Sequence, residues 1–344
     1  MVSGARRSPP TVTDGLGFVK TNTPSRDCRV DVVTVAYNSA RELRRCVEHL
    51  CRSEGVRVIV VDNSSEDASL ETVGDLDLTA IRLESNHGFA AGCNIGWRTG
   101  ESPYVLFVNP DARISPEAIE RLVAVAAGDP EAGAVAPAIV HEDGTPAHSL
   151  RSFPRLRSTF AQALFLHRLF PTSSWADELI RDERAYQRRW SPDWVSGACL
   201  LVKRSVLDEL EGWDERFFLF GEDIDLCRRL RAVGRTLWFE PSATCVHVGG
   251  ASASTSTSLP LLTAGRLRYI SLHHGSTRRI AEHAGMGLGS LLRIFVGRPG
   301  TRRAHARSLL VALGVPAPKP PSRSARSAER SSGRTAVAVA RRTR

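Results

Sequence analysis

The stretch Val105-Leu106-Phe107-Val108-Asn109-Pro110-Asp111 decides the fold class of this 344-residue chain. Its first four residues are large and apolar, which is typical of a strand that is buried on both faces of a parallel sheet. An amide and a carboxylate follow where the strand ends. Because ligands of parallel sheets gather at the carboxyl ends of the strands, the stretch predicts a buried strand that ends at a binding site.

Apolar segments of the same kind recur on both sides of this strand. They alternate with helical patterns such as residues 41–51, where Leu43, Cys46, Val47 and Leu50 share one helical face. Strand–helix units at this spacing predict an α/β fold with a Rossmann-like, mostly parallel central sheet and helices on both faces. Strands are predicted at residues 30–37, 56–61, 79–83, 104–108 and 132–139, and a helix begins at Pro116.

The regular alternation of strand and helix patterns ends at about residue 140. Asp143-Gly144 predicts the turn of a hairpin. Residues 150–190 are rich in Arg and aromatic residues and show no clear periodicity. A helix is predicted at residues 222–232, and short strands at residues 194–202, 236–240 and 244–248.

Both ends of the chain differ from this body in composition. Residues 1–28 are rich in Pro, Ser, Thr and Arg and lack the apolar segment of a signal peptide, which predicts a disordered leader. Residues 259–314 predict a helical C-terminal extension, in which Leu, Phe and Val are interleaved with Arg. Residues 315–344, rich in Pro, Ser and Arg, predict a disordered basic tail.

Charge and composition narrow the class of protein. With 42% hydrophobic and 24% charged residues, the chain has the balance of a folded globular protein. The formal net charge of +9 gathers at the C-terminal end, where Glu329 is the only acid after Arg293. This indicates either contact with an anionic lipid surface or a solvated tail without a partner. The body carries no nucleic-acid-recognition motif, so no nucleic acid partner is expected.

The cysteine pattern and the hydropathy of the chain indicate its cellular compartment. None of the seven Cys residues stands in a C-x-x-C pair, which argues against a zinc site and a disulfide framework and favours a reducing compartment. No apolar run approaches the roughly 18 to 20 residues that span a bilayer. We therefore expect a cytoplasmic protein that is either soluble or peripheral on the inner face of the cell membrane.

Two strand ends in the first half carry polar or small residues. Asp62 follows a buried strand and could bind a base or a ribose, or it could cap the next helix. The loop at 86–94 contains two glycines, which allow a backbone to approach a ligand but are also common in βα turns. A dinucleotide-binding G-x-G-x-x-G motif does not follow the first strand, which argues against a dehydrogenase.

Asn109 and Asp111 form the most informative pair. Positions i and i+2 at a strand end point the same way, so both side-chain oxygens could face one cation. Mg²⁺ and Mn²⁺ sites use one or two protein carboxylates and complete the shell with water and substrate phosphates. The alternative is a turn in which Asp111 caps the following helix.

Two later segments add acids and a histidine. Glu222, Asp223 and Asp225 begin the predicted helix directly after an aromatic run. They could pair with the helix dipole, or one could be a general base whose pKa is raised by apolar surroundings. His247 ends a strand before two glycines and could be structural or ligate the same cation.

In order, these segments resemble family 2 glycosyltransferases of the GT-A fold, and within them the bacterial rhamnosyltransferase-type members that act on polyprenyl-diphosphate sugars. Any single motif is weak, and the ordered set is specific. The matching residues are Thr34-Val35-Ala36-Tyr37-Asn38-Ser39, Val60-Val61-Asp62-Asn63-Ser64-Ser65, Asn86-x-Gly88-Phe89-Ala90-x-Gly92-x-Asn94, Asn109-Pro110-Asp111, Trp194-Val195-Ser196-Gly197-Ala198-Cys199, Gly212-Trp213-Asp214-Glu215-Arg216-Phe217-Phe218, Gly221-Glu222-Asp223-Ile224-Asp225-Leu226 and His247.

The resemblance implies a role for each matching residue. The nucleotide would be held by Thr34, Tyr37, Asn38 and Asp62, and the donor pocket lined by Asn86, Gly88, Asn94 and Asn109. Asp111 would bind a divalent cation, Mg²⁺ or Mn²⁺, with His247 as a further ligand, because Asn109 stands where the family's D-x-D motif has its first acid. Asp223, from the pair with Glu222, would be the catalytic base. The acceptor side would be shaped by Trp194, Ser196 and Gly197.

The reaction implied by the resemblance is an inverting transfer of a sugar from a nucleotide-diphosphate donor to a saccharide hydroxyl. The subgroup suggests dTDP-rhamnose as the donor, and UDP-linked hexoses and galactofuranose are the alternatives. The acceptor would be a saccharide, lipid-linked through polyprenyl diphosphate, in cell-envelope polysaccharide synthesis. Residues 29–258 would form the catalytic domain, with a nucleotide-binding half at 29–140 and an acceptor half at 141–258. Residues 266–313 would lie in the membrane interface or pack on the core. The alternative function is a non-catalytic nucleotide-sugar-binding or scaffold protein of the same fold.

Overall fold

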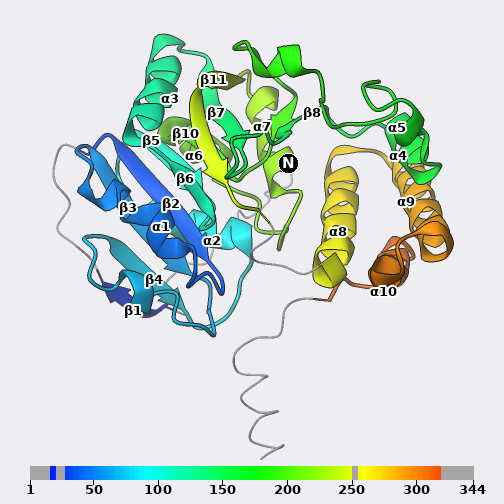
Figure 1. Cartoon of the computed structure of the whole chain (residues 1–344), viewed down its shortest axis with the longest axis horizontal. Coiled ribbons are helices and arrows are strands. Elements are labelled where there is room, and N and C mark those ends of the chain that lie inside the picture. The colour runs from blue at the N-terminus through cyan, green and yellow to red at the C-terminus, as the bar shows by residue number, and fades with distance from the viewer. Residues whose placement is uncertain (1–15, 21–27, 250–254, 319–344) are drawn as a thin grey trace, which may run out of the picture.

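The computed structural model describes residues 16–20, 28–249 and 255–318. Figure 1 shows an α/β body built on a nine-stranded sheet, with a group of helices beside it. The strand order is β1-β4-β3-β2-β5-β10-β7-β11-β6. The strands are β1 (Leu16–Lys20), β2 (Val30–Ala36), β3 (Val56–Asp62), β4 (Thr79–Leu83), β5 (Tyr104–Val108), β6 (Ala112–Ile114), β7 (Ala132–Val140), β10 (Cys199–Lys203) and β11 (Thr236–His247).

The sheet is mostly parallel, as the repeated strand–helix units predict. Strands β4, β3, β2 and β5 pair in parallel, and so do β7 and β11. Strand β10 lies antiparallel between β5 and β7, which leaves these two neighbours pointing the same way. The edge strands β1 and β6 are antiparallel to β4 and β11.

Helices cover both faces of the sheet because each buried strand is apolar on both sides. Val32 of β2 packs with α1 (Leu43–Val47) and α3 (Pro116–Gly128) on one face. Val33 packs with α2 (Phe89–Thr99), α6 (Arg204–Leu210) and α7 (Glu222–Ala232) on the other. The predicted helix start at Pro116 is confirmed, since Ser115 Oγ accepts a hydrogen bond from the Ala118 amide at 3.2 Å.

Four local predictions need correction. The leader expected to be disordered contains β1, which the pairing with β4 stabilises; its remaining residues lie outside the described ranges. The helix expected at 41–51 is shorter, with α1 followed by a 3₁₀ turn at Leu50–Arg52. The strand expected at 194–202 is two strands, because β9 (Trp194–Val195) leaves the main sheet to pair with β8 (Leu150–Arg151). The two strands expected at 236–248 are one long strand, β11, with an irregularity between Glu240 and Thr244.

The C-terminal helical extension is confirmed. It consists of α8 (Thr255–His273), α9 (Ser276–Val296) and α10 (Arg302–Ala312). Two short helices from the unassigned segment, α4 (Leu156–Ala163) and α5 (Leu166–Leu169), stand with them in Figure 1, and α4 packs on α9. The helical part is therefore assembled from two distant stretches of sequence. Of the tail predicted at 315–344, residues 315–318 are described and form no helix or strand, and the rest lies outside the described residues.

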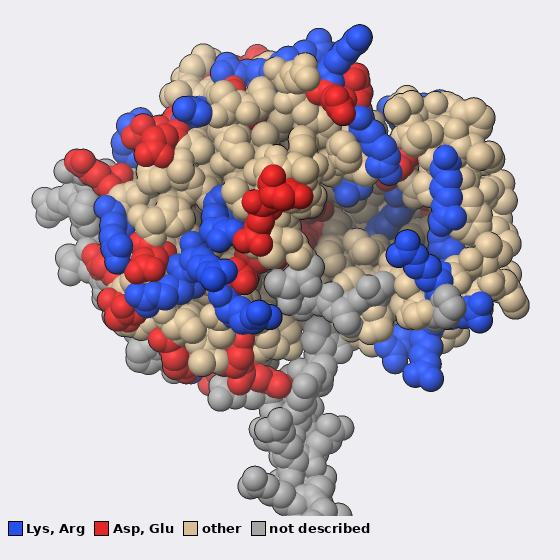
Figure 2. All heavy atoms as spheres, viewed as in Figure 1, with Lys and Arg blue, Asp and Glu red and all other residues tan. Residues whose placement is uncertain are grey.

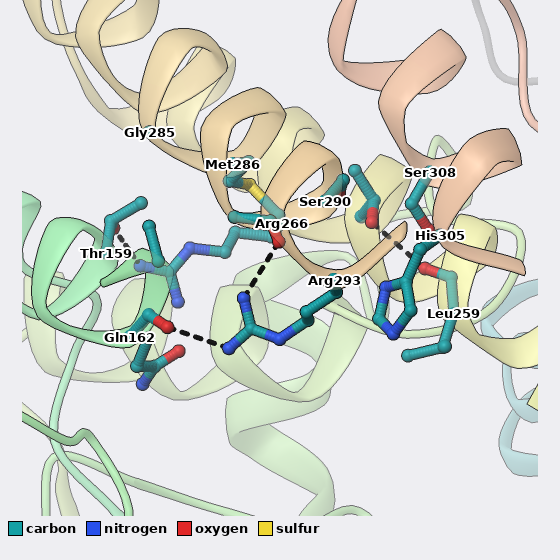
Figure 3. A pocket seen from close by; sticks show the side chains of 13 residues that line it. Thr159, Gln162, Leu259, Arg266, Gly285, Met286, Ser290, Arg293, His305 and Ser308 are labelled. Carbon is teal, nitrogen blue, oxygen red and sulfur yellow. Dashed lines mark hydrogen bonds between the residues drawn. The ribbon is translucent and has the colours of Figure 1, made fainter. Parts of the chain in front are cut away.

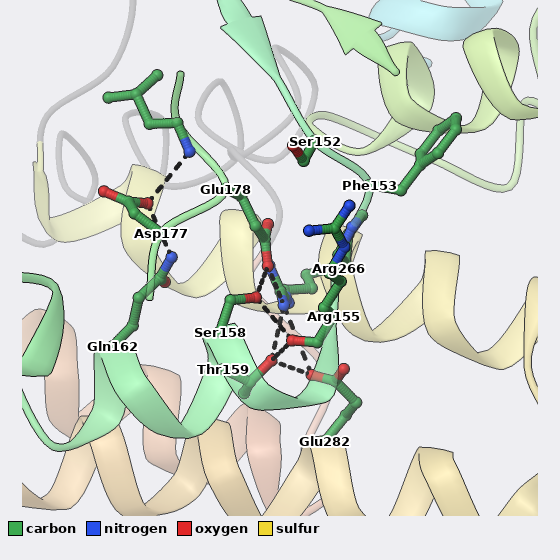
Figure 4. A network of polar contacts seen from close by, with 12 residues as sticks. Ser152, Phe153, Arg155, Ser158, Thr159, Gln162, Asp177, Glu178, Arg266 and Glu282 are labelled. Carbon is green, nitrogen blue, oxygen red and sulfur yellow. Dashed lines mark hydrogen bonds and ion pairs between the residues drawn. The ribbon is translucent and has the colours of Figure 1, made fainter. Parts of the chain in front are cut away.

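A buried polar network fastens α4 to the C-terminal helices (Figure 4). The Arg266 guanidinium of α8 donates to both carboxylate oxygens of Glu178, each at 2.7 Å. Thr159 of α4 donates to Glu282 of α9 at 2.6 Å. Burial alone would raise the pKa of Glu178, but the charge and hydrogen bonds of Arg266 outweigh it and lower that pKa. Each buried charge thus has an opposite partner, which buried ions require.

Candidate active site

Two strand ends bring Asp111 and His247 together. Strand β6 pairs with β11 so that Ala112 lies opposite His247, and the Val248 amide donates to the Asp111 carbonyl at 3.0 Å. The Asp111 Oδ1 to His247 Nε2 distance is 3.1 Å, and Asp111 is only 7% exposed. Residues separated by more than a hundred positions therefore meet at one edge of the sheet.

The donor set suits a divalent cation that is shared with a substrate. A carboxylate oxygen and an imidazole nitrogen are ligands that Mn²⁺ and Mg²⁺ accept, and a diphosphate and water would complete the shell. Among the described residues, no group of three or more His, Cys, Asp or Glu could hold a metal by itself. Asn109 contributes its backbone to the turn, where its amide donates to the Ala198 carbonyl at 2.9 Å.

The acidic pair at the start of α7 consists of the buried Glu222 and the half-buried Asp223. Burial raises the pKa of Glu222 to about 8, and the neighbouring Asp223 adds to the shift. One carboxyl oxygen of Glu222, Oε2, has no hydrogen-bond partner. Burial also raises the pKa of Asp223, although hydrogen bonds from the Ile224 and Gly197 amides oppose this. With a pKa of about 8, Glu222 keeps its proton at neutral pH, whereas the two amide hydrogen bonds to Asp223 favour the ionised form of that carboxyl group.

Two backbone hydrogen bonds at the 196–198 turn connect Asp223 to the strand end that carries Asp111. Asp223 Oδ2 accepts a hydrogen bond from the Gly197 amide at 3.3 Å. The carbonyl of the next residue, Ala198, accepts one from the Asn109 amide at 2.9 Å. Asp111 lies two residues beyond Asn109 on that strand end. The turn at 196–198 thus bonds both to Asp223 and to the strand end that carries Asp111.

Comparison with known proteins agrees with this geometry. Residues 31–211, more than half of the chain, match the Glycosyl transferase family 2 domain. The chain belongs to glycosyl transferase family 2. Membership of this family makes the protein a glycosyltransferase enzyme, which decides against the alternative of a non-catalytic binding or scaffold protein.

Relatives and solved structures refine the family assignment. An N-acetylglucosaminyl-diphospho-decaprenol L-rhamnosyltransferase of Mycobacterium tuberculosis is 29% identical over 301 residues, covering 82% of this chain and 97% of its own. Rhamnosyltransferase WbbL of Escherichia coli is 22% identical, covering 63% of this chain and 83% of its own. GalNAc-T7, solved with UDP, GalNAc and Mn²⁺, has a TM-score of 0.56 at 13% identity, covering 84% of this chain and 56% of its own; it shows the shared GT-A fold alone.

The residues predicted to hold the nucleotide are only partly accessible in the family 2 transferase. Tyr37 is half-buried, and Asn38, with φ 53°, is exposed at the end of β2. Thr34 has no exposed surface and lies in the core beside Cys46, so its side chain is not available to a ligand. Asp62 is fully buried, with Oδ1 accepting from the Ser65 amide at 3.1 Å and Oδ2 from Arg82 at 3.0 Å.

Two residues predicted to line the donor pocket have structural roles instead. Asn94 is 1% exposed and makes hydrogen bonds of 2.8–3.0 Å to Trp97, Trp213 and Glu215. It holds the 212–215 loop against α2. Gly88 has φ 94°, and a Cβ there would overlap the Phe218 backbone. Asn86 closes the same turn by accepting from the Gly88 amide at 2.9 Å.

The three residues predicted for the acceptor side lie in or just before the turn at 196–198, whose Gly197 amide donates to Asp223. Trp194 is 8% exposed, its indole donates to the Ser152 carbonyl at 3.0 Å, and the Arg151 guanidinium lies 5.3 Å from its ring. A Cβ added to Gly197 would lie 3.4 Å from the Asp223 Cβ, so little space separates this turn from Asp223. Ser196 is half-buried in the same turn.

Sequence reasoning missed three residues that shape the site. Asn63 bonds the Gly88 carbonyl and the His87 amide, both at 2.9 Å, and so fixes the 86–88 loop to β3. Arg82 lies opposite Asp62 in the β3–β4 register and neutralises it. Arg151 opposes the upward shift of the Asp223 pKa that burial causes. Only the strand register could have revealed Arg82, because an isolated Arg in a strand has no local signature.

A separate cavity of about 220 Å³ lies inside the helical extension (Figure 3). Arg293 and His305 project into it, along with Ser290 and Ser308. Arg293 donates to the backbone carbonyls of Gly289 at 3.0 Å and Gln162 at 2.7 Å, and no ion pair of it is found in the described residues. Burial and the charge of Arg168 lower the pKa of Arg293. This end of the molecule therefore carries uncompensated positive charge.

Proposed function

We propose that this protein transfers L-rhamnose, with inversion, from a nucleoside-diphosphate donor to a hydroxyl of an N-acetylglucosaminyl-diphospho-polyprenol. The Mycobacterium tuberculosis relative is named an N-acetylglucosaminyl-diphospho-decaprenol L-rhamnosyltransferase, and the match covers 82% of this chain and 97% of the relative. The observation that carries the proposal is the backbone connection from Asp223 to the strand end that carries Asp111, which bonds His247.

Different side chains serve the acceptor, the leaving group and the nucleoside in a single-displacement reaction. Asp223 accepts the proton of the acceptor hydroxyl, and the protonated Glu222 beside it adds no second negative charge. One base suffices for inversion, because no carboxylate nucleophile is needed to form a covalent intermediate. Asp111 and His247 would hold a divalent cation, whose charge stabilises the departing nucleoside diphosphate. Asp62 and Asn38 lie at the neighbouring strand ends, where the nucleoside would bind.

Donor choice is tested by thermal unfolding with a panel of nucleotide sugars, with and without Mn²⁺. A ligand that binds the folded state raises its apparent stability by mass action. We expect dTDP-rhamnose to stabilise the protein more than UDP-hexoses do. Equal stabilisation by all donors, or preference for a UDP-hexose, would contradict the donor assignment.

The base is tested by Asp223→Asn. Loss of a general base costs roughly 10²- to 10⁴-fold in turnover, whereas binding of the nucleoside diphosphate should change by only a few-fold. Asp208→Asn on exposed α6 is the matched control and should have wild-type turnover. Near-normal turnover of Asp223→Asn would remove Asp223 from this role, and a product with the donor's anomeric configuration would rule out a single displacement.

An enzyme with a lipid-linked acceptor must bind at a membrane surface, and the helical extension has an exposed apolar surface that suits such binding. In the described part of the chain no helix is both long and apolar enough to cross a bilayer. Phe295, Val296 and Leu169 are each more than 70% exposed at the end of α9 and on α5. The guanidinium groups of Arg168 and Arg293 lie within 4.7 Å of the Phe165 ring between them. Exposed apolar side chains flanked by Arg suit the interface of an anionic membrane.

Membrane contact is tested by sedimentation with vesicles. We expect binding to vesicles that contain phosphatidylglycerol, reduced binding to neutral phosphatidylcholine vesicles, and reduced binding of a Phe295→Ser/Val296→Ser variant. An Ile280→Ser variant, altered at another exposed apolar position on α9, is the control. Equal binding of wild type and the double variant would show that this face is not the contact.

A further inference from the structure

A cavity of about 450 Å³ separates the aromatic run before α7 from the helical extension. Figure 2 shows the hollow between the α/β body and the helices. Its size is within the range of small-ligand sites. Its walls are largely apolar and come from the 217–220 loop, α8 and the end of α10: Phe218, Phe220, Leu261, Leu267, Val311 and Val315.

One wall of this cavity is rigidly connected to the catalytic base. Phe220 and Gly221 lead directly into α7, with φ 68° and 90°. Their backbone lies against Gly265 of α8, so closely that a Cβ on either glycine would overlap the opposite backbone. Asp225 of α7 also bonds His273 of α8 at 2.7 Å. The cavity and the acidic pair Glu222–Asp223 are therefore held in a fixed relation.

The other end of the cavity reaches the donor side. His87 lines it, next to the turn that Asn86 and Gly88 form. The Phe89 amide donates to the Phe218 carbonyl at 2.8 Å, so the aromatic wall and the donor loop are bonded together. A molecule lying in the cavity would extend from beside the reaction centre outward between the body and the helices.

Two arginines and two histidines lie among the residues that line the cavity. Arg216, Arg268, His87 and His283 line it, and Glu215 is the one acid among its lining residues. Glu215 accepts a hydrogen bond from Asn94 at 2.8 Å and so faces away toward α2. Arg216 is bound to Asp214, which raises the pKa of the guanidinium. Arg268 is exposed and, within the described residues, forms no ion pair. It is thus an unpaired guanidinium beside an apolar wall.

We infer that this cavity binds the diphosphate and the first isoprenoid units of the acceptor, with Arg268 as the diphosphate ligand. The inference rests on the proposed function and names the part of the acceptor that lies outside the reacting sugar. A planar guanidinium matches the paired oxygens of a phosphate, and the Phe and Leu wall matches a hydrocarbon chain. The glycan would then lie toward Asp223, and the lipid would leave past α10 toward the exposed face of the helices.

The test compares two acceptors that share the same sugar. One is N-acetylglucosamine diphosphate with an undecyl chain, and the other is the octyl glycoside of N-acetylglucosamine, which lacks phosphate. We expect Arg268→Gln to lower kcat/KM for the diphosphate acceptor about tenfold relative to the octyl glycoside, the size of one lost charge-assisted contact. Arg279→Gln, which removes an exposed charge on α9 outside the cavity, should leave both values unchanged. An unchanged ratio of the two kcat/KM values would overturn the inference.

A second variant and a binding measurement test the cavity without relying on sugar transfer. Ala264→Phe narrows the cavity from α8 and should weaken calorimetric binding of undecyl diphosphate, as Arg268→Gln should. If transfer from dTDP-rhamnose fails while Arg268→Gln still weakens undecyl diphosphate binding, the donor assignment is wrong and the cavity assignment stands. If both variants bind undecyl diphosphate like the wild type, the cavity does not hold the acceptor diphosphate.

Discussion

Glu222→Gln should stabilise the fold in a way that depends strongly on pH. Glu222 is 6% exposed, and its Oε2 atom has no hydrogen-bond partner. Burial, with the nearby Asp223, raises its pKa from 4.5 to about 8. Between these two values the folded state keeps the proton that the unfolded state has lost. Stability therefore falls as pH rises through this window, since the unfolded chain binds fewer protons.

The magnitude follows from the width of the window. Between pH 4.5 and about 8 the free energy of unfolding falls by about 1.4 kcal/mol per pH unit, which amounts to about 5 kcal/mol at pH 8. A glutamine keeps the shape of the protonated acid and cannot ionise. The variant should therefore resemble the wild type near pH 5 and exceed it in stability by several kcal/mol near pH 8.

Urea unfolding followed by tryptophan fluorescence at several pH values between 5 and 8 measures this difference. Glu120→Gln, at an exposed position of α3, is the matched control and should follow the wild-type pH dependence. The quantity to compare is the free energy of unfolding of Glu222→Gln minus that of the wild type. If this difference does not grow between pH 5 and 8, Glu222 is not protonated in the folded protein, and the assignment of Asp223 as the sole anion of the pair loses its basis.

Three further substitutions test other parts of the structure. Asp111→Ala should weaken Mn²⁺-dependent binding of the nucleoside diphosphate about tenfold by calorimetry, with binding in chelator unchanged; equal loss in chelator would exclude a cation role. Asn94→Ala should lower the free energy of unfolding by about 2–4 kcal/mol, because it leaves buried partners at Trp97 and Trp213 unsatisfied. Arg266→Ala should lower the free energy of unfolding by about 3–5 kcal/mol, because Glu178 is then buried without its cationic partner. Adding Glu178→Gln to this variant should restore part of the lost free energy of unfolding, which urea unfolding would measure.

The sequence alone was sufficient for several strand positions in the first half of the chain and for the order of the polar strand ends. The strands at 79–83 and 104–108 and the helix at 222–232 have the predicted bounds, because apolar runs and first-turn acids are local signals. The edge strand β1 was missed because its stability comes from β4, which no local pattern reveals. For the same reason the helices α4 and α5 could not be assigned to the extension, since their partners lie more than a hundred residues away.

For the site, the sequence determined which residue types stand at the strand ends and which acids precede α7. Only the tertiary structure decided their roles. The pairing of β6 with β11 joins His247 to Asp111, and the backbone contact of Phe218 turns Gly88 into a packing glycine. Asn94 and Thr34 fit a family motif equally well whether they face a ligand or the core, and the fold places both in the core. A motif fixes the order of side chains along the chain, whereas the side that each one faces depends on which distant elements pack against it.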